Sequence, residues 1–153
     1  MTEPSSILTS VNQTHRLIRE TLEQYSDKLI DKIAESLKRE ATLAYQKMDL
    51  AALRQIAQGA LFQTACWMEA CSGQIIENDL SEGLTQRLKL GFTIADFTST
   101  TDLVEREIKE FYREVFEDRP DLIQRSMVRL DGIYTIVRTV EARMVMRHHK
   151  NKE

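Results

Sequence analysis

Apolar side chains recur every three or four residues along most of this chain, and no other feature of the sequence limits its fold so strongly. Such spacing places the apolar residues on one face of an α-helix. A first run covers three heptads with Leu8, Val11, His15, Ile18, Leu22, Tyr25 and Leu29. A second run near the end contains Ser126, Leu130, Ile133, Val137, Val140 and Met144. The sequence therefore predicts long helices at both ends of the chain.

Turn-forming residues are scarce, which extends this prediction to the whole chain. Its 153 residues include only 5 Gly and 2 Pro, whereas a turn-rich β fold needs many of both. A chain of this length buries enough surface for one hydrophobic core without metal or disulfide support. We therefore expect a single all-α domain over residues 1–153.

Local signals predict where the helices begin. The N-terminal pattern predicts a helix over 5–30, continued as one long helix or as two in series. Asp49 is suited to cap a central helix, and Asp79 with Glu82 has the spacing of a capping box. Ser99 with Asp102 has the spacing of another helix start. Pro120 suits the first turn of the final helix, which we predict over 121–149.

The two terminal runs resemble the seams of coiled coils, because threes and fours alternate along them. Two seams at opposite ends of a short chain favour a homodimer built from the first and last helices. The expected interface residues are Leu8, Val11, His15, Ile18, Leu22, Ile133, Val137, Val140 and Met144. The alternative is that both seams pack inside one monomeric bundle.

Aromatic and sulfur-containing residues are concentrated in the middle of the chain, where they indicate either a hydrophobic core or a ligand pocket. A pocket for an apolar ligand would use Phe62, Cys66, Trp67, Met68, Phe92 and Phe111. The alternative is that these side chains are ordinary core residues.

Signatures of metal binding and catalysis are missing. Cys66 and Cys71 lie five apart in a predicted helix, on different faces and beyond disulfide distance. Adjacent His148 and His149 point in different directions on a helix, so we expect no metal site. The isolated glycines match no nucleotide-binding pattern. We therefore predict that the protein is not an enzyme.

Charge and targeting signals favour a cytoplasmic protein. The net charge is −3, and no half of the chain is basic enough for nucleic-acid binding. The N-terminus has an acid and a proline where a signal peptide needs a basic stretch and an apolar core. No apolar run is long enough to span a membrane. We therefore expect neither a nucleic acid nor a membrane as partner.

The segment LTQRLKLGFTIADFTSTTDLVEREIKEF, residues 84–111, together with the order of the expected helices, resembles the N-terminal sensor domains of RsbR-type stressosome scaffold proteins. The resemblance implies a globin-like fold that dimerises and in many members holds no haem. It also implies that the last helix joins a C-terminal effector, typically an STAS domain whose phosphorylation governs release of a kinase. The chain would then be either an excised sensory domain or a stand-alone relative.

The sequence agrees with the absence of haem, because no histidine lies between His15 and His148 to serve as the proximal ligand. Cys66, Met68 or a tyrosine could ligate iron in principle, but we expect no cofactor. The resulting prediction is a non-enzymatic sensory or regulatory domain that relays a signal through its last helix. Alternatives are a helical adaptor that binds proteins, or a sensor for a small apolar ligand or haem.

Overall fold

The structure, a computed structural model, describes the backbone of residues 4–69 and 72–151 and the side chains of 11–69 and 72–151. Within these residues the chain forms helices and no strand, which confirms the all-α prediction. The helices are α1 (Pro4–Gln24), α2 (Ser26–Glu40), α3 (Leu43–Gln46), α4 (Leu50–Glu69), α5 (Gly73–Lys89), α6 (Ile94–Val115) and α7 (Pro120–Asn151). In the described part, no helix combines the length and hydropathy that crossing a bilayer requires.

The N-terminal helical segment is divided at Tyr25, so the helix predicted over 5–30 is two helices in series. Tyr25 has backbone angles of φ −104° and ψ 17°, outside the helical region, and its carbonyl accepts from the Leu29 amide. Its ring packs against Phe111 of α6 at a centroid distance of 5.6 Å. The break lets α1 and α2 each pack along α4.

The central helix α4 begins as the sequence predicts. The Asp49 carboxylate accepts a 2.8 Å hydrogen bond from the Ala52 amide, which is the expected helix cap. At the other end, Arg129 of α7 donates from Nε to the Met68 carbonyl at 2.9 Å and from Nη2 to the Trp67 carbonyl at 3.2 Å. A side chain of α7 thus satisfies backbone carbonyls in the last turn of α4.

The helix start predicted at Asp79 is wrong. Ser72 caps α5 instead, because its hydroxyl accepts from the Ile75 amide, and Asp79 lies in the middle of that helix. The helix ends in a Schellman motif, in which the amide of Phe92 donates to the Arg87 carbonyl and that of Gly91 to the Leu88 carbonyl. Gly91 has φ +92°, a conformation that favours glycine.

The helix start predicted at Ser99 is also wrong. Helix α6 begins earlier, at a capping box in which the Thr93 hydroxyl accepts from the Asp96 amide and the Asp96 carboxylate accepts from the Thr93 amide. Asp96 also accepts from the Thr42 hydroxyl. Although burial opposes ionisation, the hydrogen bonds from Thr42 and Thr93 hold the pKa of Asp96 below its usual value.

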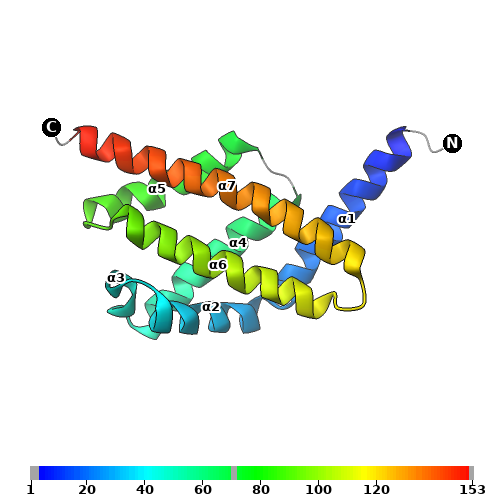
Figure 1. Cartoon of the computed structure of the whole chain (residues 1–153), viewed down its shortest axis with the longest axis horizontal. Helices are drawn as coiled ribbons and strands as arrows, with labels where there is room; N and C mark the ends of the chain where they lie inside the picture. Colours follow the sequence, from blue (N-terminus) through cyan, green and yellow to red (C-terminus); the bar gives the residue numbers. More distant parts are fainter. Residues whose placement is uncertain (1–3, 70–71, 152–153) are drawn as a thin grey trace.

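The long C-terminal helix α7 starts at Pro120, as predicted, and reaches Asn151. It runs beside α6, and both pass over α4, so that α4 is enclosed between these two helices and α1 and α2 (Figure 1). Helix α5 packs on the second half of α7.

Two hydrophobic clusters result from this arrangement. The larger joins α1, α2, α4, α6 and the first half of α7. The smaller joins α5 and the start of α6 to the second half of α7 through Leu84, Leu88, Phe97, Val140 and Val145. A cavity lies where these clusters meet.

Candidate functional site

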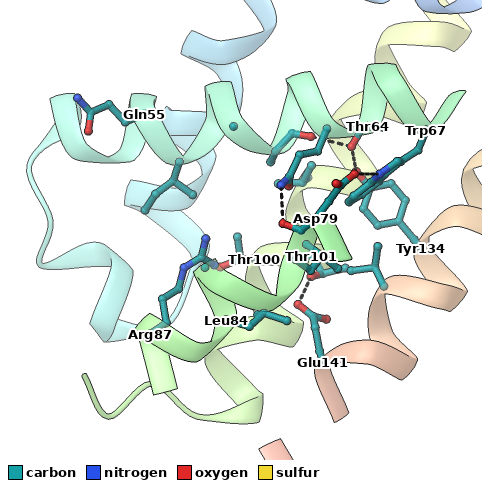
Figure 2. A pocket seen from close by; sticks show the side chains of 18 of the residues that line it. Gln55, Thr64, Trp67, Asp79, Leu84, Arg87, Thr100, Thr101, Tyr134 and Glu141 are labelled. Atoms are coloured by element: carbon teal, nitrogen blue, oxygen red, sulfur yellow. Dashed lines mark hydrogen bonds between the residues drawn. The ribbon is translucent and has the colours of Figure 1, made fainter. Parts of the chain in front are cut away.

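A cavity of about 460 Å³ lies between α4, α5, α6 and α7 (Figure 2). Its size is within the range that binds small molecules. The cavity is open to solvent on the side of Gln55, Gly59 and Asp79, which are exposed. Most of its wall is apolar, with contributions from Ile56, Trp67, Leu80, Leu84, Val104 and Val137.

Glu141 of α7 is the most unusual group in the wall, because its side chain is charged in solution yet the residue is only 5% exposed. Oε2 accepts a 2.8 Å hydrogen bond from the Thr101 hydroxyl of α6. Oε1 is buried and has no hydrogen-bond partner. Burial raises the pKa of Glu141 to about 7, although the Thr101 hydrogen bond and the charges of Arg138 and Arg87 lower it. Near neutral pH this carboxyl is therefore poised between its two protonation states.

Tyr134, also on α7, joins the cavity wall to α4. Its hydroxyl lies 2.8 Å from the Thr64 hydroxyl, which itself donates to the Ala60 carbonyl at 2.8 Å. The Thr64 oxygen therefore accepts from Tyr134. Burial raises the pKa of Tyr134, so its phenol is neutral and acts as a donor here.

Trp67 and Asp79 form a second polar link, between α4 and α5. The indole Nε1 donates to Asp79 Oδ2 at 2.9 Å, and Gln63 Nε2 donates to the Asp79 carbonyl at 3.2 Å. Trp67 is the single tryptophan of the sequence. Tryptophan fluorescence of this protein therefore comes from one residue, which lies in the cavity wall.

Arg87 of α5 brings a positive charge to the cavity, one helical turn after Gly83. Its Nη1 lies 3.5 Å from the Tyr45 hydroxyl, which is a weak contact. Figure 2 shows Arg87 to the left of Glu141, with the Leu84 side chain between them and Thr101 directly above Glu141. Chemically, the site offers an apolar body with two acids, Asp79 and Glu141, and one base, Arg87, in its wall, an arrangement suited to binding a small amphiphilic molecule.

The predicted pocket residues do not surround this cavity together. Only Trp67 lines it. Met68 is 1% exposed in the core, while Phe62 is 66% exposed on α4 and Cys66 is a partly exposed free thiol. Phe92 packs on Tyr45 and Phe111 on Tyr25, at centroid distances of 5.2 and 5.6 Å. Phe92 and Phe111 therefore stabilise contacts between helices, as the core interpretation expects, whereas Phe62 is not a core residue.

The residues predicted to form a dimer interface are mostly covered within one chain. The exposed fraction is 0% for Ile18 and Leu22, 2% for Ile133, 4% for Val137 and 3% for Val140. These five therefore pack inside the bundle, and a second copy could not reach them. Met144 and Val11 are partly exposed, and the side chain of Leu8 lies outside the described residues. His15 is partly exposed near α7, where burial and the charges of Arg129 and Arg125 lower its pKa. A homodimer stays a prediction.

No cluster of three or more metal-ligating side chains occurs in the described ranges. Cys71 lies outside them.

The sequence analysis does not predict the polar residues of the cavity wall, such as Glu141 and Arg87. The position of Glu141 in the sequence of α7 could have revealed it. Glu141 follows Val137 by four residues and Tyr134 by seven, so it lies on the buried stripe of α7. An acid at a stripe position indicates a polar group in the interior. Comparisons with protein-family models, with curated proteins and with solved structures each find no match for this chain.

Proposed function

We propose that this protein is a non-enzymatic sensory or regulatory domain that binds a small molecule between α4, α5, α6 and α7 and transmits the change along α7. The role is the one implied by the resemblance to RsbR-type stressosome sensor domains, in a globin-like form without haem. Support comes from a single observation: the helix that lines the cavity with Tyr134, Val137 and Glu141 also continues beyond it through residues 142–151.

Transmission would begin at two side chains of α7, Tyr134 and Glu141, which line the cavity. Each is now hydrogen-bonded to another helix and could bond to a ligand instead. A ligand that turns the Glu141 carboxylate alters its bond to Thr101, and one that displaces Tyr134 breaks its bond to Thr64. Either change alters how α7 is held against α6 and α4. Because α7 is one helix from Pro120 to Asn151, a shift at 134–141 moves the residues that follow.

Hydrogen exchange of the full chain tests this proposal, with Trp67 fluorescence to establish saturation by each probe. The probes are L-leucine and cyclohexanol, which are small and partly apolar. A bound probe should slow exchange in the cavity walls and also change exchange in 142–151, which does not line the cavity. The variant Gly83→Leu serves as the control that blocks binding. Gly83 lines the cavity, and a side chain added there would begin beside Arg87 and reduce the volume of the cavity.

The proposal fails if the probes saturate Trp67 fluorescence and exchange in 142–151 stays unchanged. It also fails if Gly83→Leu responds as the unaltered protein does, because the response would then arise elsewhere.

A second candidate function, as a protein-interaction adaptor, is favoured by Phe62. This side chain is 66% exposed beside a groove between α1, α2 and α4, whose wall includes Leu22, Ile30 and Ala65. Large exposed aromatic residues at grooves are common in protein interfaces. We propose a second copy of the chain as its occupant, in keeping with the expected homodimer.

A further inference from the structure

We propose that the ligand of the cavity is a small zwitterion, with an ammonium group held by Glu141, a carboxylate held by Arg87 and an apolar body between them. This inference rests on the proposed function and specifies the chemistry of its ligand. It is argued from unfilled hydrogen-bonding capacity at two points of the cavity wall.

The first point is Glu141, whose acceptor capacity is only partly used. Thr101 donates to Oε2, while Oε1 is buried without a hydrogen-bond partner. An unpartnered buried polar atom is costly and therefore rare in native proteins. The terminal torsion of glutamate is broad, so a modest rotation turns the carboxylate toward a donor in the cavity. An ammonium group offers three donors and the opposite charge.

The second point is Arg87, whose guanidinium has five N–H donors. Within the part of the chain that the structure describes, its recorded side-chain contact is the weak one to Tyr45, at 3.5 Å. Planar guanidinium groups bind carboxylates through two parallel hydrogen bonds. A carboxylate in the cavity would therefore meet a guanidinium that no acid of the described residues occupies.

The two charges belong to one site, because Arg87 and Glu141 line the same cavity, and the charge of Arg87 lowers the pKa of Glu141. No direct ion pair joins them among the described side chains, and the cavity that both line has a volume of about 460 Å³, enough for a small molecule. A ligand with a single charge would pair with either Glu141 or Arg87 and would leave the other group without a partner of opposite charge. A zwitterion pairs with both, and its apolar part contacts Trp67, Leu84 and Val137.

Ionisable groups on each wall bear on the pH dependence of this pairing. Arg87 on α5 and Arg138 on α7 favour ionised Glu141, whereas Asp102 on α6 opposes it. Asp79 on α5 is the other acid of the cavity wall, and α4 contributes the neutral Thr64 and Trp67. An ammonium group requires the ionised acid. Affinity should therefore rise about tenfold from pH 6 to pH 8, while Glu141 ionises.

The experiment titrates the full-length chain with L-leucine and with straight-chain ω-amino acids of four to eight carbons, which span different charge separations. Trp67 fluorescence gives the dissociation constant. Each probe is compared with its N-acetyl derivative, which lacks the cation, and with the amine that lacks the carboxylate. At least one zwitterion should saturate, and each deletion should weaken binding by about tenfold or more.

Two variants that each remove one charge assign the charges. Glu141→Gln should remove the preference over the N-acetyl derivative and the rise in affinity with pH. Arg87→Gln should remove the preference over the amine. Comparing ligand analogues on the unaltered protein keeps the test valid even if a variant folds poorly.

The inference is overturned if no zwitterion saturates at about 10 mM, or if deleting either charge leaves affinity unchanged. Cyclohexanol separates this failure from failure of the proposed function. If it binds in the cavity and changes exchange in 142–151 while charge deletion has no effect, the sensory role stands and the zwitterionic ligand does not.

Discussion

The hydroxyl of Thr101 on α6 donates a 2.8 Å hydrogen bond to Oε2 of Glu141 on α7, at a residue that is only 5% exposed. The contact joins the two long helices at the wall of the cavity. The other carboxylate oxygen, Oε1, lacks a hydrogen-bond partner. When Glu141 is ionised, its buried negative charge is therefore only partly compensated by hydrogen bonds. The energetic cost of that ionisation is measurable.

Glu141→Gln should change how stability depends on pH. The pKa of Glu141 is about 7 in the folded chain against 4.5 for an unperturbed glutamate. The folded state therefore binds the proton more tightly, and stability falls as pH rises from 4.5 to 7, then levels off. Glutamine cannot ionise, so the variant should match the unaltered protein near pH 5 and exceed its stability at pH 8, by up to about 3 kcal/mol.

Urea unfolding at both pH values measures this difference. Glu20→Gln on the exposed side of α1 is the matched control, and its effect should be small at either pH. A Glu141→Gln effect that is equal at pH 5 and pH 8 would contradict the account.

Thr64 and Tyr134 should be energetically coupled, because their hydroxyls share a buried 2.8 Å hydrogen bond between α4 and α7. Thr64→Val leaves the Tyr134 hydroxyl without its acceptor and should cost about 1–3 kcal/mol of folding free energy. Tyr134→Phe removes the other partner. The double variant should cost less than the sum of the two, and strict additivity in urea unfolding would refute the coupling.

Gly91 and Gly132 should respond oppositely to alanine. Gly91 has φ +92° in the turn after α5, where a Cβ adds strain, so Gly91→Ala should destabilise the protein by about 1 kcal/mol. Gly132 lies on the exposed side of α7, and a Cβ there would meet nothing within 4 Å. Gly132→Ala should stabilise by roughly 0.5–1 kcal/mol, because alanine favours helix. Thermal unfolding with the same sign for both would contradict the observed turn.

Phe62 should control self-association if the groove beside it receives a second copy. Phe62→Ser should then weaken the dimer by about tenfold or more. Val128→Ser on α7 is a matched control, because Val128 is also 66% exposed. Sedimentation equilibrium measures both. Association that is equally strong in the two variants would exclude this groove as the dimer interface.

The helices could be predicted from the sequence because their apolar stripes are long and regular. Asp49 and Pro120 were identified correctly as starts, since each directly precedes or opens such a stripe. Asp79 was misassigned because its spacing to Glu82 imitates a capping box, yet its carboxylate accepts from Trp67. Capping patterns identify a possible start, whereas only tertiary contacts determine whether the chain is already helical there.

The cavity could not be predicted in the same way. Its polar wall combines Thr64, Arg87, Thr101 and Glu141 from four different helices, and no local pattern relates them. The terminal seams favour a dimer but leave a monomeric bundle open, because a heptad pattern is the same whether the partner helix belongs to the same chain or another. Their burial within one chain depends on the antiparallel return of α7 along the bundle.

A distance measurement across the bundle tests the central claim most directly. Spin labels at Lys28→Cys on α2 and Met146→Cys on α7 occupy exposed positions outside the cavity wall, in a background with Cys66 and Cys71 replaced. Pulsed electron paramagnetic resonance then compares the free protein with protein saturated by the best-binding probe, as judged by Trp67 fluorescence. The account predicts a shifted or narrowed distance distribution, because the occupied cavity repositions α7. An unchanged distribution at full saturation would contradict it.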